Sequence, residues 1–79
     1  MHLNSVKYFW ADYMYRVKIK NWLASDYAYA LELGAEYFDQ STWEYAFAKE
    51  LDAINFSLGI GENFVDFRNL NYVQKKFLE

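Results

Sequence analysis

Side chains that could carry out covalent chemistry are few in this sequence. The only histidine is His2, close to the start of the chain, and none of the 79 residues is cysteine. A nucleophilic serine needs a base held beside it, and no imidazole accompanies any of the four serines. We therefore expect no catalytic residue and predict that the protein is not an enzyme.

Carboxylates and glycines give equally weak signals for a metal or cofactor. Glu32 and Glu36 are four residues apart and would share one face of a helix, where paired acids can bind a divalent cation. However, the Glu-x-x-His pattern of di-iron bundles is absent. The segment Gly59-Ile60-Gly61 lacks the third glycine and the preceding strand of a dinucleotide-binding loop, and Glu62 follows it directly. We predict a turn there, and neither a metal nor a cofactor.

The first 22 residues combine positive charge with aromatic rings. Four cations against one acid give this segment a net charge of +3, and its rings could stack on bases while its cations meet phosphates. Nucleic-acid modules are usually basic overall, whereas this chain has a pI of about 5.0. Nucleic-acid binding is therefore an alternative prediction. Its candidate residues are Lys7, Tyr15, Arg16, Lys18, Lys20 and Trp22.

The middle of the chain is acidic and rich in rings. Residues 23–66 hold nine acids against Lys49, and 23% of the whole chain is aromatic. A single small core cannot enclose that many rings, so some should lie at the surface, where rings favour protein interfaces. We predict first that the protein binds a protein partner, and that it could also self-associate. The predicted binding residues are Tyr27, Tyr29, Glu32, Glu36, Tyr37, Asp39, Trp43, Glu44 and Tyr45.

Size, acidity, tyrosine content and the lack of cysteine give the chain a general character. In these respects it resembles small accessory proteins of phages and mobile elements that inhibit host machinery such as restriction or CRISPR effectors. This resemblance implies an inhibitor of the anti-restriction or anti-CRISPR kind. The absence of cysteine, of a signal-peptide pattern and of a long apolar stretch predicts a cytoplasmic protein without a membrane partner.

Helical spacing is the main signal for the elements that would position these residues. There is no proline, and the three glycines lie at 34, 59 and 61, which favours long regular elements. Ser41-Thr42-Trp43-Glu44 has the pattern of a capping box. Apolar residues then follow at steps of four, four, three and four, which predicts a helix over 42–58 that Gly59 ends.

Three more segments fit the same period. Helices are predicted over 5–23, over 26–38 and over 64–77 with Asn63 as its cap. Gly34 inside the second could be a helix C-cap or a point of close contact with another helix, and we favour the close contact. The first segment is ambiguous, because Tyr13, Tyr15, Val17 and Ile19 also alternate with polar residues as in a half-buried strand. Its only candidate partners, 54–60 and 64–67, are interpreted as helix and turn.

The predicted fold is therefore all-α, a single domain over 1–79 in the form of a compact bundle of three to four helices. The alternative is an α+β fold with a short N-terminal strand around residues 12–20. The predicted core consists of Trp10, Tyr13, Val17, Leu31, Phe38, Phe47, Leu51, Ile54, Phe67, Leu70, Val73 and Phe77.

Overall fold

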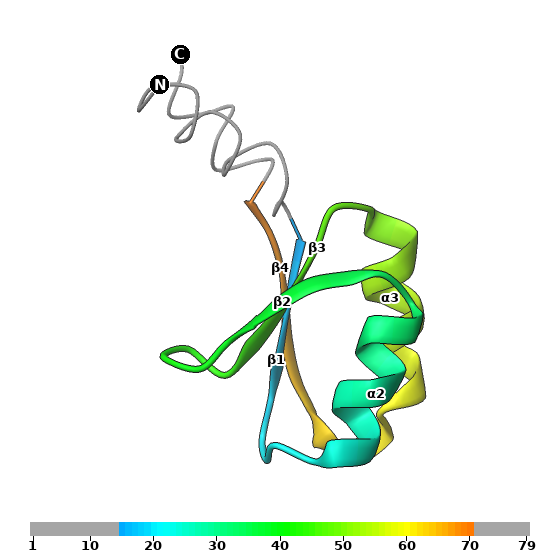
Figure 1. The fold of residues 1–79 in the computed structure, drawn as a ribbon. Coiled ribbons are helices and arrows are strands. Elements are labelled where there is room, and N and C mark those ends of the chain that lie inside the picture. Colours follow the sequence, from blue (N-terminus) through cyan, green and yellow to red (C-terminus); the bar gives the residue numbers. More distant parts are fainter. Residues whose placement is uncertain (1–14, 71–79) are drawn as a thin grey trace, which may run out of the picture.

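The residues that the structure describes form a four-stranded sheet with two helices against one of its faces (Figure 1). The computed structural model describes residues 15–70. The elements in chain order are β1 (Tyr15–Ile19), α2 (Ala24–Glu32), β2 (Ala35–Asp39), β3 (Glu44–Phe47), α3 (Glu50–Gly59), the 3₁₀ turn η1 (Gly61–Asn63) and β4 (Phe64–Asn69). The prediction of an all-α bundle is therefore wrong, and the chain has an α+β fold.

The strands lie in the order β2-β3-β1-β4, and every neighbouring pair is antiparallel. This connection of β-α-β-β-α-β elements is the split βαβ, or ferredoxin-like, arrangement. Strands β3 and β1 are central, while β2 and β4 form the two edges. Both helices lie on the same side of the sheet, so the opposite face, which we call the open face, has no described helix over it (Figure 1).

Strand β1 explains why the apolar residues of segment 5–23 fitted the spacing of a helix and also that of a strand. Val17 and Ile19 are buried on the helix side, whereas Arg16 and Lys18 lie on the open face. The strand alternative around residues 12–20 thus fits the structure over Tyr15–Ile19, and the helix predicted over 5–23 is wrong from Tyr15 onward. The part before Tyr15 lies outside the described residues. The partners of β1 are β3 and β4.

The helix predicted over 26–38 ends early. Helix α2 stops at Glu32, and Gly34 has a φ of 99°, which side chains with a Cβ rarely adopt. Gly34 therefore works as a helix terminator and not as the interior contact point that we predicted. The chain then extends into β2, where Tyr37 and Phe38 point to opposite faces.

The predicted capping box is part of a hairpin. The Ser41 hydroxyl donates a hydrogen bond to Asp39 Oδ1 at 2.7 Å, and the Thr42 hydroxyl donates to Glu44 Oε1 at 2.9 Å. Side chains that suit a helix cap also suit a turn, because both satisfy local backbone and carboxylate groups. The helix predicted over 42–58 is thus β3 followed by α3, which does end at Gly59. The helix predicted over 64–77 is strand β4 over Phe64–Asn69.

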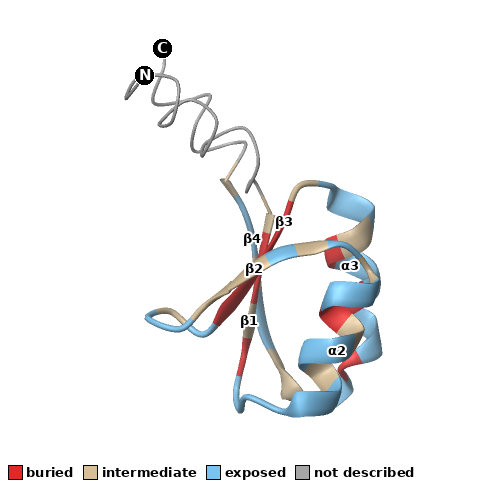
Figure 2. Cartoon of the chain, viewed as in Figure 1, coloured by how far each residue is buried: buried red, intermediate tan, exposed pale blue. Residues whose placement is uncertain are grey.

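The core lies between the sheet and the two helices (Figure 2). Its largest fully buried side chains are Tyr45, Phe47, Phe56 and Val17, so two of the predicted core residues are confirmed. Phe38 and Phe67 pack against this cluster and are partly buried, and Leu70 is half-buried.

Three predicted core residues are wrong, because Leu31, Leu51 and Ile54 are exposed. Each lies on a helix whose buried side consists of other residues, Ala30 on α2 and Ala53 with Phe56 on α3. The remaining predicted core residues lie outside the described range. They are Trp10, Tyr13, Val73 and Phe77.

Substitution at Gly34 tests the junction of α2 and β2. A Cβ at this position would be strained at a φ of 99° and would lie 3.2 Å from Asp52 Oδ2. We expect Gly34→Ala to lower the free energy of unfolding by about 1 to 3 kcal/mol, measured by urea unfolding. Gly61→Asn is the matched control, because Gly61 has a φ of 58° and nothing within 4 Å of an added Cβ. Equal stability of Gly34→Ala and the wild type would contradict this account of the junction.

Candidate functional site

Five aromatic rings from the strands, α2 and two loops follow one another in tilted and edge-on contacts, and we call this set the ring stack. Trp22, in the loop after β1, lies 5.7 Å from Tyr27 of α2, and Tyr27 lies 6.3 Å from Tyr45 of β3, measured between ring centroids. Tyr45 lies 4.7 Å from Phe38 of β2, which in turn meets the edge of Trp43 at 5.9 Å. Rings from distant parts of the chain thus form one continuous stack.

Both ends of the ring stack face solvent, and its centre is fixed in the core. Trp22 is 43% exposed, Tyr27 39% and Trp43 40%, whereas Tyr45 is fully buried. Tyr45 also packs on Phe56 of α3 at 4.9 Å. Burial raises the pKa of the Tyr45 hydroxyl to about 12, with the nearby Asp26 adding to the shift. The exposed rings therefore rest on a buried ring that is packed into the core.

Aliphatic side chains extend the apolar area along α2. Leu23, Tyr27 and Leu31 are spaced four residues apart, so they lie on one stripe of the helix, and all three are exposed. Tyr29 points to the other side of α2, where its ring meets Phe56 of α3 at 5.8 Å. The stripe therefore faces away from α3. We call Trp22, Leu23, Tyr27, Leu31 and Trp43 the aromatic surface.

The backbone at Trp43 holds its ring in place. Trp43 has a φ of 60°, in the left-handed region that a bulky residue seldom occupies. Its carbonyl accepts a hydrogen bond from the Ile19 amide at 3.0 Å, and the preceding Thr42 carbonyl accepts one from Lys18 Nζ at 2.8 Å. These bonds tie the β2–β3 loop to β1, so the loop presents Trp43 in a defined position.

Both helices carry acidic residues. Helix α2 carries Asp26 and Glu32, helix α3 carries Glu50 and Asp52, and neither helix contains a lysine or an arginine. Glu36 on edge strand β2 is exposed as well. A negative field of this kind attracts a positively charged partner surface.

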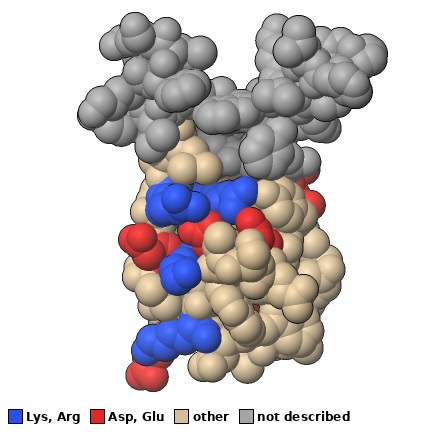
Figure 3. Space-filling view, turned by 90° about the vertical axis from the view of Figure 1, so that its left-hand side faces the viewer, with Lys and Arg blue, Asp and Glu red and all other residues tan. Residues whose placement is uncertain are grey.

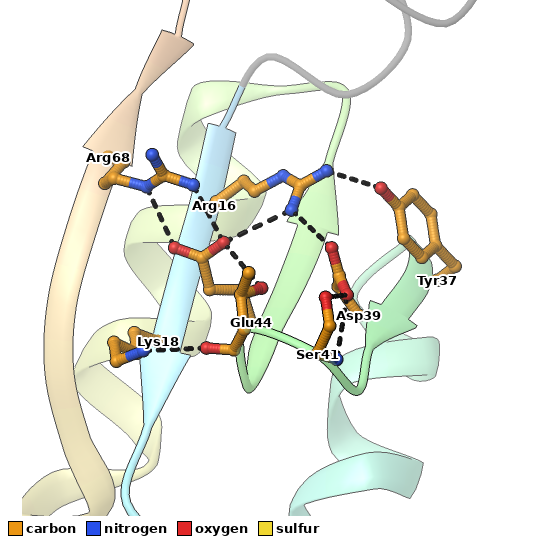
Figure 4. Close-up of polar contacts among 8 residues, drawn as sticks. Arg16, Lys18, Tyr37, Asp39, Ser41, Glu44 and Arg68 are labelled. Atoms are coloured by element: carbon orange, nitrogen blue, oxygen red, sulfur yellow. Dashed lines mark hydrogen bonds and ion pairs between the residues drawn. The ribbon is translucent and has the colours of Figure 1, made fainter.

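The open face carries a network of ion pairs centred on Glu44. Figure 3 looks onto this face and shows basic and acidic atoms side by side. Arg68 of β4 donates two hydrogen bonds to the Glu44 carboxylate, from Nε to Oε2 and from Nη2 to Oε1, both at 2.9 Å (Figure 4). Arg16 of β1 donates from Nη1 to Glu44 Oε1 at 3.2 Å and to Asp39 Oδ2 at 3.0 Å.

The edge of the network is closed by an aromatic side chain. Arg16 Nη2 donates to the Tyr37 hydroxyl, and the guanidinium lies 5.6 Å from the centre of that ring. Arg16 and Glu44 are only 6% and 3% exposed. The Arg16 and Glu44 side chains are therefore paired within the network, and neither is available to bind a ligand.

Hydrogen bonds from hydroxyl and guanidinium groups lower the pKa of both acids. Burial alone would raise the pKa of Glu44, but hydrogen bonds from Arg68, Thr42 and Arg16 outweigh it and hold the pKa below its usual value. The hydrogen bonds from Ser41 and then from Arg16 lower the pKa of Asp39 from 3.8 to about 2. Both carboxylates are charged at neutral pH.

The structure divides the predicted protein-binding residues between two faces. Tyr27 and Trp43 lie on the aromatic surface, and Tyr45 is the buried base beneath them. Glu32 and Glu36 are exposed on α2 and β2, and Tyr29 is exposed only in part, on the side of α2 that meets α3. The other three, Tyr37, Asp39 and Glu44, belong to the open-face network.

The residues predicted for nucleic acid are similarly dispersed. Tyr15 stacks on Phe67 at 6.4 Å, while Arg16 and Lys18 are engaged on the open face. Lys20 is exposed, and Lys7 lies outside the described residues. Trp22 joins the aromatic surface, a role that sequence analysis did not assign to it. Leu23 and Leu31 were missed too, although their spacing around Tyr27 was a usable signal.

Residues 15–70 contain neither a cluster of metal-binding side chains nor a candidate membrane-spanning helix. In this part of the chain, no group of three or more His, Cys, Asp or Glu side chains is arranged to hold a metal ion. No helix found there has both the length and the apolar character needed to cross a membrane.

Acid should weaken the open-face network. Because the pKa of Asp39 is lower in the folded chain, its contribution to stability is complete above its ordinary pKa of 3.8 and is lost as the pH falls toward 2. The lowered pKa of Glu44 acts in the same direction. We expect the free energy of unfolding, measured by urea titration, to fall as the pH is lowered from about 5 to about 2, and to fall less in Asp39→Asn. Identical pH profiles would contradict the pairing of Asp39.

Neutralising Glu44 should cost more than neutralising an exposed acid of the same sheet. Glu44→Gln leaves the buried Arg16 short of one anionic partner, and we expect a loss of about 2 to 4 kcal/mol in the free energy of unfolding. Asp66→Asn is the control, because Asp66 is exposed on β4 and we expect a change of less than about 0.5 kcal/mol. Comparable losses in the two variants, measured at neutral pH, would show that the network is not the stabilising element.

Comparisons of the chain with protein-family models, with curated proteins and with solved structures gave no match. The function therefore has to be inferred from the geometry of the two surfaces described above.

Proposed function

We propose that this domain is a non-enzymatic protein-binding module that contacts its partner through the aromatic surface. The observation that carries the proposal is the exposure of Trp22, Tyr27 and Trp43 on one ring stack whose central ring, Tyr45, is buried. Isolated exposed rings are common on proteins, but a connected set with adjoining leucines is typical of an interaction site.

Rigid rings are efficient anchors for a protein interface. Tryptophan and tyrosine supply a large contact area and have few rotatable bonds, so they dominate many interface hot spots. Here the rings are already ordered by their neighbours and by the bonded β2–β3 loop, which lowers the entropy lost on binding. The surface is therefore suited to insertion into apolar pockets of a partner.

The charges next to the rings indicate what such a partner carries. Asp26 and Glu32 lie on the same helix as Tyr27, and α2 has no cation to neutralise them. Complementary charge speeds association and sets orientation. The partner surface that fits is therefore an apolar groove bordered by lysine or arginine.

Binding of nucleic acid is less well supported by the open face. Domains with a four-stranded sheet that bind RNA through the sheet stack bases on rings of the central strands. In this chain the open-face positions of β1 and β3 hold Arg16, Lys18, Glu44 and Ala46 instead of rings. The first three are already engaged in hydrogen bonds.

An inhibitory role against host machinery and a cytoplasmic location are consistent with this proposal. An inhibitor of this type needs only to occupy a surface of its target, and the aromatic surface requires no catalytic group. Both remain predictions from the sequence.

Removal of the two tryptophan rings tests the proposal. We expect the double variant Trp22→Ser/Trp43→Asn to lose at least about tenfold in partner capture from host lysate, because each ring is a candidate hot spot. Asparagine is chosen at position 43 because it tolerates the left-handed φ. Val65→Ser is the matched control, because Val65 is also 45% exposed but lies on β4.

Thermal unfolding of each variant should first show that the fold is retained. Capture is measured by quantitative mass spectrometry after nuclease treatment, at low and at high salt. A partner that binds the double variant as well as the wild type would contradict the proposal. So would a captured species that nuclease removes, because it would favour the nucleic-acid alternative.

A further inference from the structure

Helix α3 carries a second apolar stripe on the side that faces away from the sheet. Leu51, Ile54 and Leu58 are 66%, 38% and 75% exposed, and they follow one another at steps of three and four residues. Apolar residues at this spacing form the line of contact along which two helices pack. The buried side of the helix is formed by Ala53 and Phe56 (Figure 2). The stripe is therefore not needed for the core of its own domain.

The stripe is symmetric along the helix. Its midpoint falls between Ile54 and Asn55, with one leucine about a turn before it and another about a turn after it. When a second copy lies antiparallel on this stripe, Leu51 of each copy faces Leu58 of the other. Ile54 and Asn55 then lie beside the twofold axis, where two amide side chains can pair because each has a donor and an acceptor.

Charge selects the antiparallel arrangement over the parallel one. The acids of α3 are Glu50 and Asp52, both in its first turn, and the second half of the helix is uncharged. A parallel pair would place Glu50 next to its own copy, whereas an antiparallel pair places it near the uncharged last turn of the partner's α3, with Glu62 beyond that turn in η1. Asp52 is turned toward Gly34, away from the stripe. Antiparallel pairing also opposes the two helix dipoles.

We propose that a second copy of this chain occupies the α3 stripe and forms an antiparallel, twofold-symmetric dimer. The stripe is separate from the aromatic surface, which faces away from α3, so each protomer of the dimer keeps its own ring stack exposed. A stripe of about three turns buries little area compared with a standard interface of about 1,600 Å². The dimer is therefore weak, with a dissociation constant in the range of about 10 to 500 µM.

Sedimentation equilibrium of the full chain from about 5 µM to about 1 mM tests the proposal, because this range spans the dissociation constant estimated above. We expect the wild type to move from monomer to dimer across this range. Leu58→Glu and Leu51→Lys should each weaken dimerisation by at least about tenfold, because each places two charges against apolar side chains. Both positions are at least 66% exposed, so the fold should tolerate the changes. Val65→Glu is the matched control, since Val65 is 45% exposed on β4, and it should leave dimerisation unchanged.

Mixing the two charged variants identifies the pairing. In an antiparallel dimer, the new carboxylate of L58E would face the new ammonium group of L51K, and the remaining contact would be a leucine pair. An equimolar mixture of L58E and L51K should therefore regain dimerisation that neither variant shows alone. In a parallel dimer, the two charges would lie at opposite ends of the stripe and the mixture would stay monomeric.

Three results would overturn the proposal. The first is a wild type that remains monomeric at the highest concentration, as expected if another protein covers the stripe. The second is a dimer that persists in Leu58→Glu, and the third is a mixture that does not recover. None of these outcomes depends on the aromatic surface, so the proposed function can fail or hold independently.

Discussion

The carboxylate of Glu44 connects all four strands of the sheet. Glu44 lies on β3, accepts hydrogen bonds from Arg16 on β1 and Arg68 on β4, and reaches β2 through the bonds of Arg16 to Asp39 and Tyr37. A buried carboxylate is costly unless it is fully paired, and a slip of β1 or of β4 would remove one of the two guanidinium partners of Glu44. The pairing therefore specifies the strand register as well as contributing to stability. It also allows β3 to be buried on both faces, with Tyr45 and Phe47 on one side and Glu44 on the other.

Local sequence patterns predicted some parts of the fold and misled in others. The end of a helix at Gly59 and the burial of Val17 and Phe47 were foreseen, and the strand alternative identified β1. The helix predicted over 42–58 failed because apolar residues of β3 and α3 happen to continue the same spacing across the turn between them. Within α3, the residues at that spacing face solvent. The helix packs on the sheet through Ala53 and Phe56 instead, and these two residues are fully buried.

The two candidate surfaces could be predicted only in part. An excess of rings was visible from composition, but their division into core and surface depends on the pairing of distant strands, which spacing within one segment does not encode. Tyr45 was expected to bind a partner and is instead the base of the stack, while Trp22 was assigned to nucleic acid and lies at its exposed end. From the sequence, residues 1–22 were interpreted as a basic segment and residues 23–66 as an acidic one. In three dimensions, Arg16 and Arg68 neutralise the acids of the hairpin, so the acidic character remains on the helices.

The pairing of β1 with β4 has a consequence for how this domain can be joined to other proteins. Tyr15 lies directly opposite Asn69 in the sheet, so the chain enters and leaves the described fold at neighbouring points. Trp22 follows the far end of β1, about 15 Å or more away for a strand of five residues. A host domain could therefore accept this fold as an insertion in one of its surface loops, and the inserted unit would still present its tryptophan at the distal tip.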